Sequence, residues 1–216
     1  GANSREEALE LIQIGDPITY TDQLEFLNDE LLVGRALDNR IGGFVIAQVL
    51  KELRSRKSDL NVNVMALNSV QEEIGGYGAR MMSYRLMPDA ALVTDVTHAT
   101  DTPGINNKEH GRVELGEGPT ISRGAANHPE IVDIISTVSE DKEIPVQFEA
   151  SSYRTGTDTD SIYHQRGGIP SALISLPQRY MHSPSEMVSL KDIEALKTLM
   201  AETILAMEPD QAFTVL

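Results

Sequence analysis

The 216-residue sequence contains no cysteine and no tryptophan, and aromatic residues make up only 5% of it. The absence of cysteine excludes disulfide bonds, thiol nucleophiles and zinc sites built from thiolates. No apolar run approaches the roughly 20 residues of a membrane helix, and the first residues show no secretory-signal pattern. We therefore expect a cytoplasmic protein that has no membrane partner.

Positive charge is also scarce in this sequence. Lys and Arg number 18 against 33 Asp and Glu, which gives a formal net charge of −15. Nucleic-acid binders draw most of their affinity from Lys and Arg contacts to phosphates, so this balance argues against nucleic acid as a partner. It suits a site that attracts metal cations or the ammonium end of a peptide, although solubility alone explains the same sign.

The most informative stretch is VQEEIGGYGA at residues 70–79. It follows an apolar run at 60–70 that predicts a buried strand. Ligands of open α/β sheets bind beyond the carboxyl ends of the strands, so we expect Glu72 and Glu73 at that edge. One carboxylate of such a pair can bind a metal while the other moves a proton. Taken alone, the pair fits two solvated loop glutamates about equally well.

Three further side chains of metal-binding type are expected at the same edge. Asp38 precedes a predicted helix, Asp95 ends a short buried run, and His182 follows a predicted strand. Two Asp, a Glu and a His converging there form a ligand set for a pair of divalent ions of the zinc, cobalt or manganese type. Capping of the following helix is the competing explanation for Asp38.

The order of the elements indicates an α/β protein with a substantial core. Residues 1–33 combine a capped helical turn with two strand-like runs, which predicts the tail of a small β-rich unit. The main predicted elements are helices at 39–57, 77–85, 128–140 and 190–207 and strands at 60–70, 89–95, 145–150 and 171–176.

Lined up in this order, the motifs closely resemble the dinuclear-metal aminopeptidases that include the tetrahedral, glutamyl and deblocking aminopeptidases, some of which carry an older endoglucanase label. The resemblance runs through essentially the whole chain. The stretches that carry it are ALDNR at 36–40, VQEEIG at 70–75, DVTHATDTPG at 95–104, TGTD at 155–158 and MHSP at 181–184.

The resemblance implies a three-layer α/β fold of the zinc-peptidase kind, with a mixed, mostly parallel sheet and helices on both faces. It implies that residues 34–216 form the metallopeptidase catalytic domain. Residues 1–33 would be the C-terminal remnant of an inserted β-rich dimerisation domain. The resemblance further implies dimers that assemble into a large hollow homo-oligomer, which would be a dodecamer in the full-length protein.

The resemblance also assigns a role to each site residue. Asp38 would bridge two divalent ions, zinc or cobalt with manganese as a further option. Glu73 and His182 would bind one ion, and Asp95 would bind the other. Glu72 would be the general base that takes a proton from the metal-activated water. The implied substrates are peptides with a free N-terminus, which makes the protein an aminopeptidase.

The chain departs from the family pattern at two places. The residue after the bridging aspartate is usually acidic in the family, and here it is Asn39. The family also uses a histidine from an N-terminal segment, and no histidine precedes Asp38 in this chain. We therefore expect the chain to correspond to the C-terminal two-thirds of the full enzyme and to be weak or inactive alone, unless water or His98 completes the coordination at Asp95.

Other functions remain open at this stage. A related dinuclear deacylase or carboxypeptidase would use the same ligands on another amide. A non-catalytic assembly domain would use the acidic residues only as caps and solvated groups. A glycosidase also needs two carboxylates, but it explains neither His182 nor the aspartates. His98 and Asp101, in the polar stretch after Asp95, are candidates for contacts to substrate or to ligands, with loop capping as the alternative.

Overall fold

The computed structural model describes residues 2–20, 23–209, 211 and 213. Its strands are β1 (Glu25–Leu27), β2 (Leu31–Gly34), β3 (Ala91–His98), β4 (Thr120–Arg123), β5 (Gln147–Ala150), β6 (Ser171–Arg179) and β7 (Glu186–Ser189). Its helices are α1 (Arg5–Leu11), α2 (Leu37–Ser55), α3 (Tyr77–Leu86), α4 (Asn107–His110), α5 (Pro129–Asp141), α6 (Thr159–Ile162) and α7 (Leu190–Leu205), with a 3-10 turn at Lys57–Asp59. The helices predicted at 77–85, 128–140 and 190–207 are thus confirmed within a few residues.

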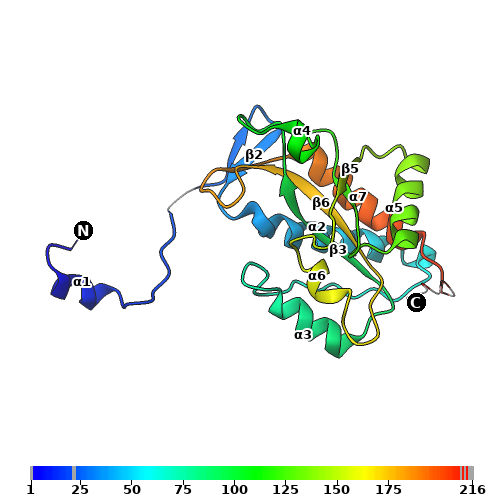
Figure 1. Cartoon of the computed structure of the whole chain (residues 1–216), viewed down its shortest axis with the longest axis horizontal. Helices are drawn as coiled ribbons and strands as arrows, with labels where there is room; N and C mark the ends of the chain where they lie inside the picture. Colours follow the sequence, from blue (N-terminus) through cyan, green and yellow to red (C-terminus); the bar gives the residue numbers. More distant parts are fainter. Residues whose placement is uncertain (1, 21–22, 210, 212, 214–216) are drawn as a thin grey trace.

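All seven strands belong to one sheet, in which the order β1-β2-β7-β6-β4-β5 is joined by β3 on β6 (Figure 1). β3 and β6 run parallel over eight residue pairs, and β4 and β5 over four. The other four strand pairs are antiparallel. The predicted mixed sheet is confirmed, but its directions are close to balanced rather than mostly parallel. The reason is the short loop between β6 and β7, since only antiparallel neighbours can be joined so directly.

Helices cover both faces of the sheet, which confirms the three layers. Side chains of a strand alternate between the faces, and β3 shows this clearly. Its Leu92 and Val96 pack with residues of α2, α5 and α7 in the main core. Its Ala91 and Val93 pack with Ala79 of α3 and with α6 in a smaller second core. The end of β3 therefore lies between two packed layers, which fixes the position of the residues it carries.

The strand predicted at 60–70 is not present in the structure. Residues 61–70 have no regular secondary structure, and a cavity of about 470 Å³ is lined both by residues 62–69 and by residues 91–95 of β3. A ladder needs backbone groups within hydrogen-bonding distance, and the cavity separates these two segments. The β-branched residues indicate that this segment favours an extended backbone. They do not indicate whether a neighbouring strand lies close enough to pair with it.

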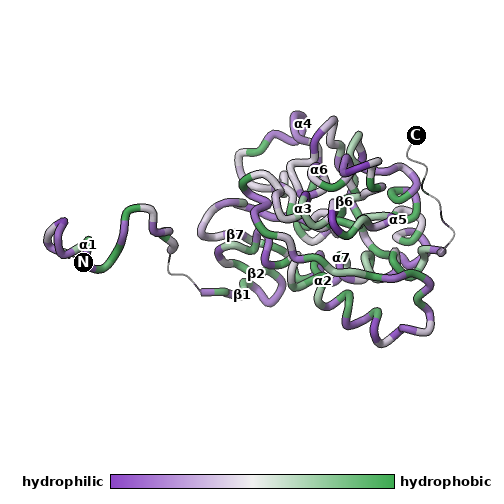
Figure 2. Tube along the Cα trace, turned by 90° about the horizontal axis from the view of Figure 1, so that it is seen from below, coloured by the Kyte–Doolittle hydropathy of each residue, from purple (hydrophilic) through white to green (hydrophobic). Residues whose placement is uncertain are grey.

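The N-terminal segment differs from the rest of the chain. No residue of α1 is buried, and Figure 1 shows α1 standing apart from the sheet. Large apolar side chains that follow are exposed, among them Ile14 at 90% and Ile18 at 95%, and Figure 2 shows a hydrophobic stretch in this segment. β2 pairs with β7, so the ladder crosses the boundary expected between residues 33 and 34. The domain boundary itself stays a prediction.

None of the helices in the described part of the chain combines the length and the apolar character needed to cross a membrane.

Candidate metal centre

Asp38 lies at the start of α2, where the chain is not yet helical. Asp38 and Asn39 have non-helical backbone angles, and the peptide bond between them is cis. The oxygen of the Asn39 side chain accepts a hydrogen bond from the backbone N–H of Gly42 at 2.7 Å, three residues on, so Asn39 is the residue that caps the regular helix. The Asp38 carboxylate is therefore not used for capping, and its oxygen lies 3.1 Å from Nε2 of His182.

Glu72 and Glu73 occupy a tight loop before α3. Backbone bonds close this loop, including Gly78 N–H to the carbonyl of Val70 at 3.0 Å. A Cβ on Gly78 would come within 2.4 Å of that carbonyl oxygen, so glycine is required there. Packing of the loop against α3 leaves Glu73 exposed and Glu72 half-buried.

His182 lies in the loop that joins β6 to β7, with a left-handed backbone at φ 61°. Its Nε2 is 3.1 Å from the Asp38 carboxylate and 3.3 Å from the Glu73 carboxylate. One ligand atom from each of these three residues lies within 4.8 Å of the other two. The structure thus brings together three of the four predicted metal ligands, which come from three distant parts of the sequence.

Asp95, the fourth predicted ligand, lies within β3 and is 8% exposed. Its Oδ1 accepts hydrogen bonds from the Asn39 side chain at 3.0 Å and from the Val96 N–H at 2.9 Å. The Asn39 side chain also donates to the carbonyl of Thr94 at 3.1 Å. Asp95 is not part of the close group of three, but Asn39 joins it to the backbone next to Asp38.

The carboxylates at this edge share an unfavourable environment. Burial raises the pKa of Asp95 to about 8, of Glu72 to about 7 and of Asp38 to about 6, and repulsion from neighbouring carboxylates adds to each increase. The pKa of Asp158 is raised by burial as well. A cation placed among these groups would favour their charged forms. The oxygen and nitrogen donors of the group of three suit zinc, cobalt or manganese, so these residues fit a divalent metal.

The raised pKa values predict how the stability of metal-free protein depends on pH. A carboxyl group whose pKa is higher in the folded than in the unfolded protein holds its proton better in the folded state. Its contribution to the free energy of unfolding is therefore present at low pH and is lost as the pH rises. For Asp95 this loss falls between about pH 4 and pH 8. Asp95→Asn keeps an oxygen acceptor and removes the charge. In EDTA at pH 8 it should raise the melting temperature by at least about 2–4 °C, the shift produced by about 1 kcal/mol.

The same comparison at pH 4 should show little or no gain for Asp95→Asn. Asp133→Asn, at an exposed position on α5, is the matched control and should leave the melting temperature unchanged at both pH values. Equal stability of wild type and Asp95→Asn at pH 8 would contradict the raised pKa.

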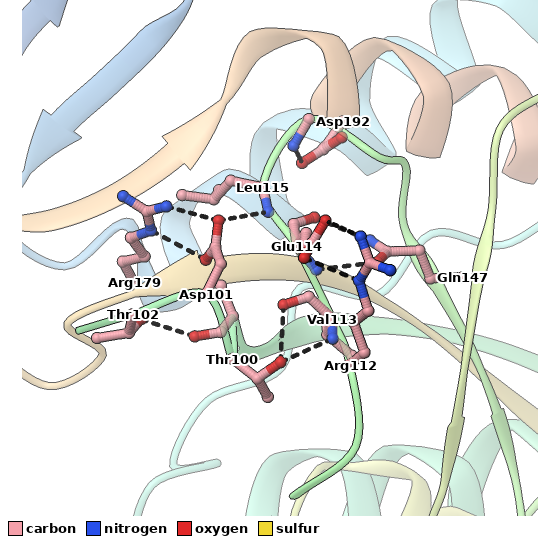
Figure 3. Close-up of polar contacts among 12 residues, drawn as sticks. Thr100, Asp101, Thr102, Arg112, Val113, Glu114, Leu115, Gln147, Arg179 and Asp192 are labelled. Carbon is pink, nitrogen blue, oxygen red and sulfur yellow. Dashed lines mark hydrogen bonds and ion pairs between the residues drawn. The ribbon is translucent and has the colours of Figure 1, made fainter. Parts of the chain in front are cut away.

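The structure does not place His98 with the group formed by Asp38, Glu73 and His182. His98 ends β3 exposed and is three positions from Asp95, so the two side chains leave the strand on opposite faces. Asp101 accepts two hydrogen bonds from the guanidinium of Arg179, at 3.0 and 2.5 Å, and one from the N–H of Leu115 at 3.4 Å (Figure 3). Asp101 therefore ties the loop after β3 to the end of β6.

Three residues at this edge were missed from the sequence. Asn39 caps α2 and holds Asp95. The Oδ2 of Asp158 accepts a hydrogen bond from the hydroxyl of Ser69. Its Oδ1 is buried and has no hydrogen-bond partner among the described residues. Glu186 contacts the backbone of both Asp38 and His182. The TGTD motif at 155–158 could have pointed to Asp158, and the departure from the family pattern at position 39 could have pointed to Asn39. No local sequence pattern indicates a role for Glu186.

Comparison with known proteins then identifies the family. The model of the M42 glutamyl aminopeptidases matches residues 1–199. The chain belongs to this family. This confirms the resemblance described from the motifs. The M42 chain is 33% identical over 195 residues to the lysyl aminopeptidase of Pyrococcus furiosus, covering 90% of this chain and 54% of that protein.

Solved structures show the same M42 fold. An aminopeptidase of the archaeon Desulfurococcus kamchatkensis superposes with a TM-score of 0.90 at 32% identity, over 100% of this chain and 61% of that one. The TET1 peptidase of Pyrococcus horikoshii, described as assembling into a tetrahedron or a large octahedral shell, superposes with a TM-score of 0.80 at 26% identity over 96% and 60%. The chain spans 54–60% of the length of the first curated relatives it matches.

Proposed function

We propose that this chain carries the metal centre and the general base of a metal-dependent aminopeptidase that removes residues from the free N-terminus of peptides. The observation that carries the proposal is the convergence of Asp38, Glu73 and His182 within 4.8 Å. Family membership supports hydrolysis of a peptide bond as the reaction. The raised pKa of Glu72, to about 7, supports its role as a base near neutral pH.

In the proposed mechanism, Asp38 would bridge two divalent ions, Glu73 and His182 would hold one, and Asp95 would hold the other. When bound, the ions would lower the pKa of a water molecule and polarise the scissile carbonyl. Glu72 accepts the proton of the attacking water and donates it to the leaving amine. Asn39 keeps Asp95 oriented through its 3.0 Å hydrogen bond.

The donor set supports zinc or cobalt, with manganese as a further option. The cavity of about 470 Å³ supports a substrate site next to the metal centre, because Asp38, Glu72 and Asp95 line it together with apolar side chains and with polar side chains such as Asn63, Asn68 and Ser69. The formal charge of −15 supports attraction of the substrate ammonium group and argues against a nucleic-acid partner.

We also propose that the protein acts in the cytoplasm as a homo-oligomer built from dimers. Residues 1–33 would belong to the dimerisation unit and residues 34–216 to the catalytic domain. The exposed apolar side chains Ile14, Ile18 and Phe26 support this assignment, since large apolar groups at such exposure mark interaction surfaces. A similar solved structure at 25% identity, described as the dodecamer of PhTET1-12s, supports a dodecamer as the assembly.

The proposed activity is tested with an aminoacyl anilide and its N-acetylated counterpart, each incubated with the protein and Zn²⁺ or Co²⁺. We expect hydrolysis of the free amine alone, at a rate below that of full-length relatives, and none in EDTA. Release of acetate from the acetylated compound would support a deacylase instead, and hydrolysis of an N-acetylated peptide with a free C-terminal carboxylate, included as a third substrate, would support a carboxypeptidase. Hydrolysis of none of these compounds by metal-loaded protein would support a non-catalytic assembly domain.

A further inference from the structure

Glu186 is a buried carboxylate that touches the backbone of two metal-binding residues. It is the first residue of β7 and is 3% exposed. Its Oε1 accepts the backbone N–H of His182 at 3.0 Å, and its Oε2 accepts the backbone N–H of Asp38 at 3.1 Å. The Glu186 side chain therefore joins the His182 loop to the start of α2. Asp38 and Glu186 are 148 positions apart in the sequence.

We infer that Glu186 is a positioning residue, which holds the main chains of Asp38 and His182 at the spacing that a metal ion needs. This inference rests on the proposed metal centre and adds a residue that supports it. Both carboxylate oxygens are engaged by N–H groups, so Glu186 acts through the two ligands. The outcome of this arrangement is the 3.1 Å contact between the Asp38 and His182 side chains.

The local backbone explains why an acceptor is needed at this place. The N–H of Asp38 belongs to the first turn of α2, where no earlier carbonyl of the helix is available. The N–H of His182 lies in a left-handed turn outside the β6–β7 ladder. A buried carboxylate is costly unless it accepts hydrogen bonds, and these two N–H groups supply them. The buried carboxylate thus has both of its oxygens hydrogen-bonded, and each N–H group has an acceptor.

The sheet fixes Glu186 itself. Its backbone pairs with Gly34 of β2 in the antiparallel β2–β7 ladder. Gly34 is four residues before Asp38, and β7 follows the His182 loop. Both metal-binding segments therefore leave the sheet next to Glu186, and the carboxylate spans the gap between them. Because strand pairing between β2 and β7 holds Glu186, the spacing between the backbones of Asp38 and His182 is set before a metal binds.

Asp192 offers a matched control for this inference. It is a fully buried carboxylate in the first turn of α7, and its two oxygens accept the N–H groups of Gly116 and Gly118, each at 2.8 Å. Figure 3 shows Asp192 beside the loop that carries Leu115. Glu186 and Asp192 thus make the same kind of double contact to backbone, but only Glu186 contacts metal-binding residues.

The experiment compares metal binding and stability in Glu186→Gln and Asp192→Asn. Zn²⁺ and Co²⁺ dissociation constants are measured by chelator competition, and melting temperatures are measured in EDTA. The glutamine side chain keeps one acceptor oxygen but points an N–H group at the second donor. We expect Glu186→Gln to weaken metal binding about 10–100-fold, the effect typical of residues that orient metal ligands. Asp192→Asn should lower the melting temperature and leave the metal dissociation constants unchanged.

Glu186→Ala should weaken metal binding more than Glu186→Gln, since it removes both acceptors. Metal affinity of Glu186→Gln equal to that of wild type, or lowered equally in Asp192→Asn, would overturn the positioning role. A measurement on wild type covers the case in which the Glu186 variants do not fold. In metal-free protein the amide protons of Asp38 and His182 should exchange slowly, and exchange as fast as in an exposed loop would overturn the inference.

The same measurements distinguish a wrong metal centre from a wrong positioning role. If wild-type protein binds neither Zn²⁺ nor Co²⁺, the proposed metal centre is wrong, and the two amide protons then decide alone whether Glu186 holds the backbone. If wild type binds metal and the Glu186 variants bind it with the same affinity as wild type, the metal centre stands and the positioning role is wrong.

Discussion

Glu72→Gln is expected to lower the rate of hydrolysis of a free-amine anilide by about 10²–10⁴-fold, the usual contribution of a general base. Glutamine keeps the size of the side chain but cannot take a proton. Glu72 lies outside the close group formed by Asp38, Glu73 and His182, so the metal content should stay at the wild-type value. The measurements are the initial rate at saturating Zn²⁺ or Co²⁺ and the metal-to-chain ratio after gel filtration.

Glu73→Gln is the matched control for this prediction, because it makes the same change one residue along the chain. Glu73 contacts His182 at 3.3 Å, so this variant should lose metal as well as activity. The two neighbouring glutamates are then distinguished by metal content. A Glu72→Gln variant that hydrolyses the anilide at the wild-type rate would rule out Glu72 as the base.

Asp38→Ala is expected to abolish binding of both metal ions. The Asp38 side chain is 9% exposed, and its carboxylate lies 3.1 Å from Nε2 of His182, whose side chain is 63% exposed. If it bridges two ions, its removal leaves each ion without a shared ligand and leaves Glu73 and His182 without their buried partner. The metal-to-chain ratio, measured after exchange into metal-free buffer with a little added Zn²⁺ or Co²⁺, should fall from near two to near zero.

Asp101→Asn provides the comparison for Asp38→Ala. Asp101 is an aspartate at the same edge of the sheet, but its carboxylate is engaged by Arg179. Its substitution should lower stability and leave the metal-to-chain ratio at the wild-type value. Loss of a single ion from Asp38→Ala would show that Asp38 is a terminal ligand rather than a bridge, and a wild-type ratio of one would require the same revision.

The site could be predicted in part because the relevant signals are local. Glu72 and Glu73 precede glycines that permit a tight turn, and His182 follows a run that forms β6. These patterns report side-chain chemistry and the preference of a short segment. The sequence left two roles open for Asp38, since a carboxylate before a helix is commonly a cap. Asn39 takes that role in the structure and leaves Asp38 available to contact His182.

The remaining features depend on distances between segments that are remote in sequence. The prediction of a strand at 60–70 was wrong. A strand needs a neighbouring strand edge to pair with, and a cavity separates this segment from β3. The nearly balanced strand directions follow from the short β6–β7 loop and from the addition of β2 to β7. Neither is encoded in the hydrophobic period of a single segment.

The sequence by itself determined the family, the helices α3, α5 and α7 and the strand that carries Asp95, and it supplied the candidate metal ligands, because periodicity, turn chemistry and motif order are properties of short stretches. Only the tertiary structure decided that Asp38, Glu73 and His182 meet, and that Glu186 joins the backbone of two of them. Such contacts form between segments as much as 148 residues apart. Packing of the whole sheet and its helices sets which buried N–H groups and carboxylates face each other, and no local pattern contains that information.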